Sequence, residues 1–250
     1  MAHPPRGISA YQLPERVASY DADMEVMHPN RSRMVEVALD FLACAPKRAV
    51  DLGIGTGYFT HRLLEKYPQV RVIAIDGSED MLRLARGRLG GSAGQVDFRS
   101  GDFRRLAELA ADARGADLVY SSYALHHLSG PEKLDVLQQA LRLLRPGGWL
   151  INADLIVAED PVLEQRIQAL RRRGIVARAG GRDPRFGDEE STRQYLERLE
   201  AQDGDQPLTL TQDLELMKNA GFHCVGPIWV EHREAVICGS RPSVAYRSRS

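Results

Sequence analysis

The sequence predicts an α/β domain built around a mostly parallel β-sheet. Between residues 49 and 155, short apolar runs of strand length alternate with segments of helix length, and such an alternation is typical of βαβ units. The apolar run that begins at Ala49 ends in a glycine-rich turn and continues directly into a helix. A chain of 250 residues is long enough for one such domain with additions, and short for two.

The composition indicates an ordinary globular protein. Apolar residues make up 43% of the chain and charged residues 27%, which is typical of soluble domains. The net charge of −1 provides no overall field that would recruit nucleic acid or a lipid surface, so we expect a small-molecule partner, no nucleic acid and no membrane. Cys44, Cys224 and Cys238 form no Cys-x-x-Cys pair, and residues 1–6 contain no apolar leader. We therefore expect no disulfide framework, no metal and a cytoplasmic location, with a homodimer left open.

Residues 1–45 are predicted to form a helical arm that precedes the sheet. A short helix is expected over residues 13–20. A second helix begins after Asn30 or Ser32, because both residue types are favourable N-caps, and Pro46 lies just beyond its end.

The central part of the chain contains five predicted strands. They cover residues 49–52, 70–75, 96–100, 116–121 and 149–155. Helices are expected to begin after the glycine turn, at Ser78, and at Ser129, where Glu132 completes the spacing of a capping box. Gly90 is expected to end the second of these helices.

Residues 157–208 interrupt the alternation and are predicted to form a helical lid. Positive charges collect in the first half of this segment and negative charges in the second. Such charges either pair or face solvent, or else the arginines meet an anionic substrate; the sequence leaves both open. A helix over residues 210–220 and two strands over 222–230 and 234–239 complete a single domain of residues 1–240, and a disordered tail, 241–250, follows.

Polar residues stand at the ends of four successive strands. Asp51 lies at the end of the first strand, Asp76 and Asp102 follow the second and third, and residues 121–127 follow the fourth. Because open α/β sheets bind ligands at the carboxyl ends of their strands, these residues predict a binding site at that edge.

The glycine-rich turn excludes two common classes of nucleotide site. It lacks the lysine of a phosphate loop, and Gly57 follows Gly53 by four residues, whereas the dinucleotide fingerprint requires five. Asp51, two residues before the first glycine, suits a ligand that carries an ammonium and a sulfonium. Together with the acids at the strand ends and the Arg145-Pro146-Gly147-Gly148 segment, the turn resembles that of the class I S-adenosylmethionine-dependent methyltransferases over residues 49–155.

This resemblance implies a fold and a cofactor. The fold is a Rossmann-like sheet of seven mostly parallel strands with an antiparallel last strand, and the cofactor is S-adenosylmethionine. The residues implied to hold it are Asp51, Gly53, Gly55, Gly57, Asp76, Gly77, Met81, Asp102, Phe103 and Ser121. Asp51 and the glycines would hold the methionine part, Asp76 the ribose, and Asp102 with Phe103 the adenine. Two alternatives stay open, since Asp76 could cap the next helix and Asp102 could belong to a turn.

The segment after the fourth strand resembles that of the family's small-molecule branch. The implied activity is transfer of a methyl group to an O, N or C nucleophile of a small metabolite. Tyr123 and His126 are the implied catalytic residues near the methyl group. His126 could act as a general base, because an imidazole with a pKa near 6.5 suits that role, or it could only shape the pocket. His127 is expected to be structural, because adjacent side chains tend to point apart.

Three further residues are candidates for substrate contact: Tyr20 on the arm, Arg193 in the lid and Trp229 on the closing hairpin. In this family N-terminal helices often cover the pocket, which favours Tyr20, while Trp229 could line the pocket or only pack. The lid resembles, more faintly, that of carboxy-S-adenosylmethionine synthase, in which an arginine holds a carboxylate; Arg193 is the nearest match. The glycine turn departs from that family. A synthase-like enzyme and a non-catalytic S-adenosylmethionine-binding module are therefore the alternatives.

Overall fold

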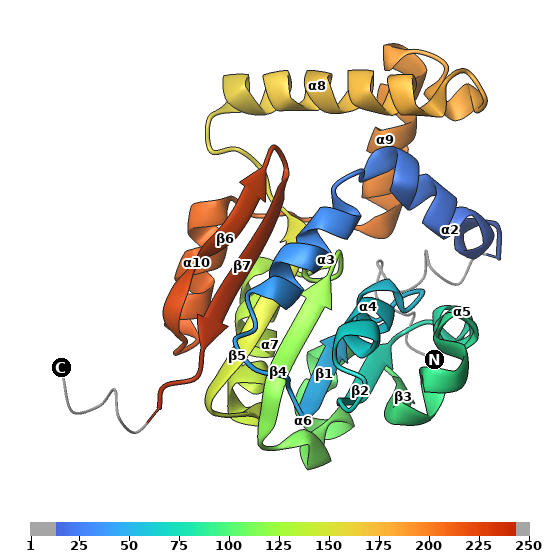
Figure 1. The fold of residues 1–250 in the computed structure, drawn as a ribbon. Coiled ribbons are helices and arrows are strands. Elements are labelled where there is room, and N and C mark those ends of the chain that lie inside the picture. The colour runs from blue at the N-terminus through green and yellow to red at the C-terminus, as the bar shows by residue number, and fades with distance from the viewer. Residues whose placement is uncertain (1–13, 244–250) are drawn as a thin grey trace, which may run out of the picture.

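The predicted fold is confirmed by the structure, a computed structural model that describes residues 14–243. One seven-stranded sheet has the order β3-β2-β1-β4-β5-β7-β6, in which only β7, the last strand of the chain, runs antiparallel to the other strands (Figure 1). The strands are β1 Arg48–Leu52, β2 Arg71–Asp76, β3 Val96–Ser100, β4 Ala116–Ser122, β5 Leu144–Leu155, β6 His223–Glu231 and β7 Glu234–Ser240. The carboxyl ends of the first four strands therefore lie at one edge.

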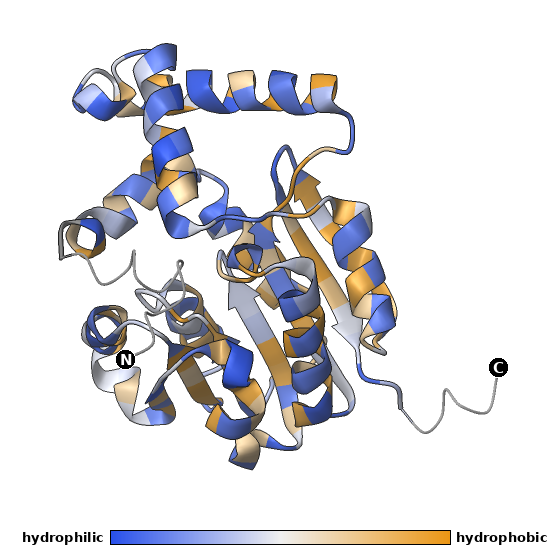
Figure 2. Cartoon of the chain, turned by 180° about the vertical axis from the view of Figure 1, so that it is seen from behind, coloured by the Kyte–Doolittle hydropathy of each residue, from blue (hydrophilic) through white to orange (hydrophobic). Residues whose placement is uncertain are grey.

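Helices cover both faces of the sheet. One face carries α3 Arg31–Asp40, α4 Tyr58–Lys66 and α5 Glu79–Leu89, and the other carries α6 Leu106–Leu109, α7 Gly130–Leu143 and α10 Leu210–Asn219. Each face has its own apolar core, and the strands between them are mostly apolar (Figure 2). A parallel sheet needs this cover on both faces, which explains the continuous apolar runs in β1 and β4.

The helix boundaries follow the local signals in the sequence. Ser78 caps α5 by accepting a hydrogen bond from the backbone N–H of Met81, and Gly90 ends the helix. Ser129 and Glu132 form the predicted capping box of α7. Asn30 occupies the N-cap position of α3 but makes no side-chain capping bond there.

The fifth strand is longer than predicted. It begins at Leu144, and its pairing with β4 shifts between Leu144 and Trp149, so that the Arg145–Gly148 segment bulges from the ladder. Gly148 is needed in this bulge, because a Cβ there would lie 3.0 Å from the carbonyl oxygen of Ala116. A bulge strengthens the local twist where the strand leaves α7.

Three helices lie beyond the carboxyl ends of the strands: α2 Pro14–Met27, α8 Pro161–Ala179 and α9 Glu189–Asp203 (Figure 1). We call them the cap. Helix α2 is longer than the predicted helix over residues 13–20, of which residue 13 lies outside the described residues. Most of the predicted disordered tail, residues 244–250, also lies outside them.

The cap has its own small core and its own ion pairs. Met27, Ile175, Phe186 and Leu196 are buried together. Arg185, in the turn between α8 and α9, pairs with Asp23 of α2 at 2.6 Å. The segregated charges of residues 157–208 thus pair in part within the cap; that the cap opens and closes as a lid stays a prediction.

Helix α8 extends beyond the rest of the molecule and exposes apolar side chains. Val162, Leu163 and Leu170 are 60%, 52% and 52% exposed. Charged residues lie between them along the helix (Figure 2). Among residues 14–243, no helix combines the length and the apolar character needed to span a bilayer.

Candidate functional site

A cavity of about 590 Å³ opens at the carboxyl ends of β1, β2 and β4, beneath the cap. Ten of the residues predicted for the site line it. Six come from the glycine turn and from the end of β2 and the start of α5: Asp51, Gly53, Gly55, Asp76, Gly77 and Met81. The other four are Tyr20, Asp102, Phe103 and Tyr123.

The three glycines of the turn have positive φ angles and separate roles. Gly53 (φ 76°) faces Ala124 so closely that a Cβ would lie 2.6 Å from the Cβ of that alanine. Gly55 (φ 55°) has nothing within 4 Å of a Cβ position, so its backbone is open to the cavity. Gly57 (φ 80°) does not line the cavity; it is the N-cap of α4 and packs against Ala85 of α5. Positive φ explains why glycine stands at all three positions.

Asp76 is held at the end of β2 by backbone donors. One carboxylate oxygen accepts from the N–H of Gly55 at 2.8 Å and the other from the N–H of Ser78 at 2.9 Å. Burial raises the pKa of Asp76 to about 6, although these hydrogen bonds oppose the change. Each oxygen keeps a lone pair, so a ligand with two adjacent hydroxyl groups can donate to both.

Asp51 is the most deeply buried acid of the cavity wall, at 2% exposure. It accepts a hydrogen bond from Thr60, whose hydroxyl also contacts that of Tyr120 at 2.6 Å. Burial raises the pKa of Asp51 to about 7, against the lowering effect of these hydroxyls. A cationic ligand would therefore meet a poorly solvated carboxyl group, and its positive charge would favour the ionised form that burial disfavours.

Asp102 combines the two roles that the sequence left open. It lines the cavity, and it also caps a short 3₁₀ turn (η2, Phe103–Arg105) through the N–H of Arg104. Its carboxylate pairs with the Arg104 side chain at 2.6 Å, and Arg104 also contacts Glu132 at 2.9 Å. Any ligand group that donates to Asp102 shares that carboxylate with Arg104.

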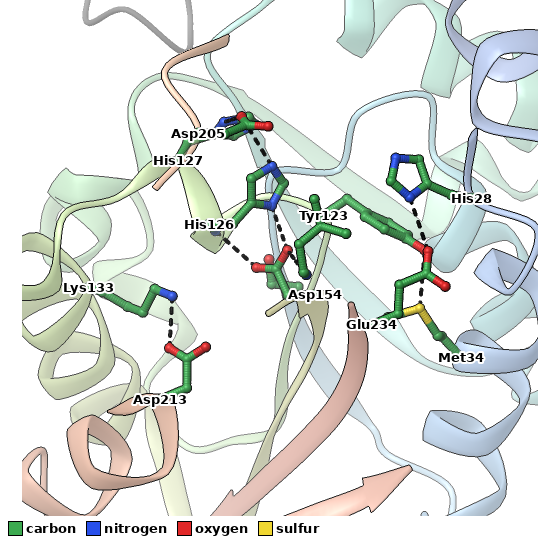
Figure 3. Close-up of polar contacts among 12 residues, drawn as sticks. His28, Met34, Tyr123, His126, His127, Lys133, Asp154, Asp205, Asp213 and Glu234 are labelled. Atoms are coloured by element: carbon green, nitrogen blue, oxygen red, sulfur yellow. Dashed lines mark hydrogen bonds and ion pairs between the residues drawn. The ribbon is translucent and has the colours of Figure 1, made fainter. Parts of the chain in front are cut away.

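Tyr123 forms a strained part of the wall just after β4. Its φ angle is +50°, a conformation that costs a residue with a side chain about 1–3 kcal/mol. The hydroxyl donates to Glu234 of β7 at 2.7 Å, and Glu234 also contacts the His28 ring at 3.0 Å (Figure 3). Because this hydroxyl is already committed, Tyr123 presents its ring, rather than a free acid or base, to the cavity.

The adjacent histidines are arranged in the opposite way to the expectation. His127 lines the cavity, whereas His126 is buried behind it, with the two rings 4.1 Å apart. His126 lies between two carboxylates, Nδ1 at 2.6 Å from Asp154 and Nε2 at 3.5 Å from Asp205 (Figure 3). Burial alone would lower its pKa, but these acids raise it to about 10. Without a bound cation, these acids therefore favour the protonated form of the ring, which argues against His126 as the general base.

Three other predicted residues lie outside the lining of the cavity. Ser121 is buried and donates to the backbone oxygen of Leu52. Arg193 is on the outer side of α9, where it pairs with Glu190 at 2.6 Å and with Glu197 at 2.8 Å. Trp229 of β6 packs against the core on the α3 side of the sheet.

The sequence reasoning missed several groups that complete the site. Arg31 lines the cavity, with its guanidinium 4.2 Å from the centre of the Tyr58 ring. It pairs with Asp21 of α2 at 2.9 Å, and Asp21 accepts from Thr56 in the glycine turn at the same distance. These contacts join the cap to the glycine turn across a long stretch of sequence, and no local sequence pattern predicts them. Asp205, after α9, also lines the cavity.

Sequence comparisons place the central segment of the chain among methyltransferases. A family model described as "Methyltransferase domain" matches residues 49–148. An uncharacterized methyltransferase of Geobacillus kaustophilus is 31% identical over 159 residues, which are 64% of this chain and 69% of that protein. A trans-aconitate 2-methyltransferase of Azoarcus sp. is 38% identical over 117 residues, but these are 45% of this chain and only 42% of that enzyme.

Solved structures show the same fold over most of the chain. An O-methyltransferase family protein from Burkholderia thailandensis superposes with a TM-score of 0.64 at 20% identity, over 94% of this chain and 64% of that one. Human N-acetylserotonin methyltransferase, solved in complex with S-adenosylmethionine, gives a TM-score of 0.60 at 19% identity, over 92% of this chain and 56% of that one. At such identities the likeness concerns the fold alone.

Proposed function

The chain belongs to the class I S-adenosylmethionine-dependent methyltransferases, and from this premise we propose that it methylates an oxygen atom of a small polar metabolite. The observation that carries the proposal is the cavity itself, where the glycine turn and Asp76 occupy one end and Tyr123, His127 and Asp205 also contribute to the wall. A volume of about 590 Å³ lies within the range of small-molecule sites, about 300–1,000 Å³.

We assign the donor-binding roles from the hydrogen-bonding capacity of each group. Asp76 receives the two ribose hydroxyls on its remaining lone pairs, and Gly55 allows the ligand to lie against the backbone. Asp51 receives the ammonium of the methionine part, and Arg31 its carboxylate. Met81 and Phe103 face the adenine ring.

The transfer step asks little chemistry of the protein. The donor is a sulfonium, so the acceptor atom attacks the methyl carbon in line while the electrons of the C–S bond pass to sulfur. Alignment and exclusion of water supply most of the rate. Tyr123 and Ala124, next to the glycine turn, supply the wall for that alignment, and His127 with Asp205 supplies polar groups for the acceptor.

Oxygen is the favoured acceptor atom for two reasons. The acceptor end offers an imidazole and a carboxylate, groups that can bind or deprotonate a hydroxyl. One relative is a trans-aconitate 2-methyltransferase, which is named for a polycarboxylate substrate. The synthase-like alternative required Arg193 to hold a carboxylate in the cavity. It is disfavoured, because Arg193 pairs with acids of its own helix and does not line the cavity.

The test is methyl transfer from radiolabelled S-adenosylmethionine to a panel of hydroxy acids, polycarboxylates and phenols, with amines as the competing class. Asp76→Ala should lower donor affinity by at least a hundredfold, since two charge-assisted hydrogen bonds are lost. Arg193→Ala is the matched control, a charge removed outside the cavity, and should keep wild-type affinity and rate. Unchanged donor affinity in Asp76→Ala would refute the donor assignment, and transfer to amines only would refute the oxygen assignment.

A further inference from the structure

We propose that His126, His127 and Asp205 form a binding site for one divalent transition-metal ion in the wall of the cavity. Each residue offers one ligand atom, and the three atoms lie within 4.8 Å of one another. The Asp205 carboxylate oxygen is 2.9 Å from Nδ1 of His127 and 3.5 Å from Nε2 of His126.

The separations between the Asp205 oxygen and the two imidazole nitrogens are close to those between the ligand atoms of a bound metal ion. Tetrahedral nitrogen and oxygen ligands at about 2.0–2.2 Å from a zinc-like ion are about 3.3–3.6 Å apart. Both carboxylate–imidazole separations are within about 0.5 Å of this range, and a rotation of the rings must bring the two nitrogens, which lie within 4.8 Å of each other, to the same spacing. Two imidazoles and one carboxylate select zinc, cobalt, nickel or iron over magnesium and calcium, which prefer oxygen ligands. Three protein ligands leave at least one coordination position for a bound molecule.

The residue behind His126 has the position of an outer-shell partner. Asp154 is 2% exposed, and its Oδ1 is 2.6 Å from Nδ1 of His126. It is itself fixed, because its two oxygens accept the backbone N–H groups of His126 and Leu155. A carboxylate in this place orients the ring and leaves Nε2 for the metal, an arrangement found at most metal-bound histidines. Figure 3 shows His126 between Asp154 and Asp205.

The backbone holds the ligands together although they are distant in sequence. His126 and His127 lie in a 3₁₀ turn (η4, Leu125–His127), and Gly204 ends α9 in the left-handed conformation just before Asp205. The N–H of Gln206 donates to the carbonyl of His126 at 2.7 Å, which fixes the Asp205 loop against the histidine turn. The carboxylates of Asp154 and Asp205 lie on either side of the His126 ring, so a divalent ion at this site would be close to two acidic side chains.

The use of this ion in the reaction rests on the proposed function. His127 and Asp205 line the cavity, so an open coordination position can bind an acceptor oxygen. A metal-bound hydroxyl releases its proton to solvent at a lower pH than a free one. The oxygen then forms the new bond to the methyl carbon, the C–S electron pair stays on sulfur, and S-adenosylhomocysteine leaves.

The experiment is a titration of the metal-stripped full-length protein with Co²⁺, followed by its visible absorption bands, with equilibrium dialysis for stoichiometry. We expect one Co²⁺ per chain and competition by Zn²⁺. Loss of an outer-shell partner costs about 10–100-fold in metal affinity, so His127→Ala and Asp205→Ala, which remove ligands, should each lose at least a hundredfold. His61→Ala is the control: His61 also lies near a carboxylate, 3.7 Å from Glu65, but on the surface.

Each outcome of this experiment either supports or refutes the proposed metal site. No stoichiometric Co²⁺ binding by the wild type at 100-fold molar excess overturns the proposal without any variant. Binding that survives in a folded His127→Ala or Asp205→Ala protein, judged by circular dichroism, also overturns it. Donor affinity measured separately by calorimetry keeps the two ideas apart: S-adenosylmethionine binding without metal binding refutes only the metal site, and metal binding without donor binding refutes only the proposed donor assignment.

Discussion

Replacing Asp51 with asparagine should make the free protein more stable at pH 8 while it weakens donor binding. The pKa of Asp51 is raised from 3.8 to about 7, chiefly by burial. Between these values the folded state holds a proton that the unfolded state has released, so the stability of the wild type falls as the pH rises through this window. Asparagine does not ionise, so the stability of the Asp51→Asn variant lacks this decrease with rising pH.

The size of the effect follows from the shift. A rise of three pKa units corresponds to about 4 kcal/mol, and 1 kcal/mol moves the midpoint of a domain of this size by about 2–4 °C. The Tm of Asp51→Asn minus that of the wild type should therefore increase by roughly 10 °C between pH 4 and pH 8, as followed by calorimetry. A difference that stays constant across this range would refute the ionisation of a poorly solvated carboxyl.

Asp117 provides a control of opposite sign. Burial raises the pKa of Asp117, but hydrogen bonds from Arg145 and from the backbone N–H groups of Lys47 and Arg48 overcome this and lower it. Its stabilising effect is present above pH 3.8 and is lost in acid. Asp117→Asn should therefore become less stable relative to the wild type as the pH rises from 3 to 5.

Donor binding gives a second observable for the same group. If the ammonium of S-adenosylmethionine binds the ionised Asp51, the wild-type affinity should rise by up to about tenfold between pH 6 and 7, as Asp51 ionises. The Asp51→Asn variant should bind weakly and should lose the dependence between pH 6 and 7; Asp76, whose pKa is raised to about 6, can still contribute below pH 6. Calorimetric titrations in matched buffers measure both, and an equal pH dependence in the two proteins would contradict the assignment of the ammonium to Asp51.

Two further substitutions test the wall next to the glycine turn. Gly53→Ala adds a Cβ 2.6 Å from that of Ala124 at a positive φ. We therefore expect the unfolding free energy to fall by about 2–4 kcal/mol and most of the donor affinity to be lost. Gly91→Ala is the control: it has open space around it and should change stability by less than about 1 kcal/mol. Tyr123→Phe deprives the buried Glu234 of one donor and should cost about 1–3 kcal/mol in urea denaturation, while donor affinity stays within twofold. A tenfold loss of donor affinity would mean that the hydroxyl, rather than the ring, serves the cavity.

The strands and the acids at their ends could be predicted because the signals are local. The apolar runs of β1 and β2 indicate where these strands end, and Asp51 and Asp76 at those ends are the groups that stand at the sheet edge. The backbone of a parallel sheet then brings those groups together without further information from the sequence. The length of β5 was mispredicted, because the glycines of its bulge look like a turn before a strand.

The sequence analysis placed His126 at the pocket and His127 away from it, whereas His127 lines the cavity; two identical neighbours carry no signal about which ring turns inward. The 3₁₀ turn decides it, and the depth of Asp154 on β5 then fixes His126. The sequence analysis did not identify Arg31 and Asp205 as cavity residues for another reason. Their positions depend on contacts with residues far away in the chain, and the sequence showed them only as a charge near a helix start and as one acid in an acidic stretch.

The long-range contacts of the cap also determine when it can assemble as the protein is synthesised. Its ion pairs join residues 162 and 187 positions apart, Arg185 with Asp23 and Asp203 with Arg16. On a ribosome, α2 leaves the exit tunnel before the five strands β1 to β5, and its partners in the cap are made after them. The roof of the cavity is therefore completed only after β5 has emerged, and until then Met27 of α2 lacks the apolar side chains of α8 and α9 against which it later packs.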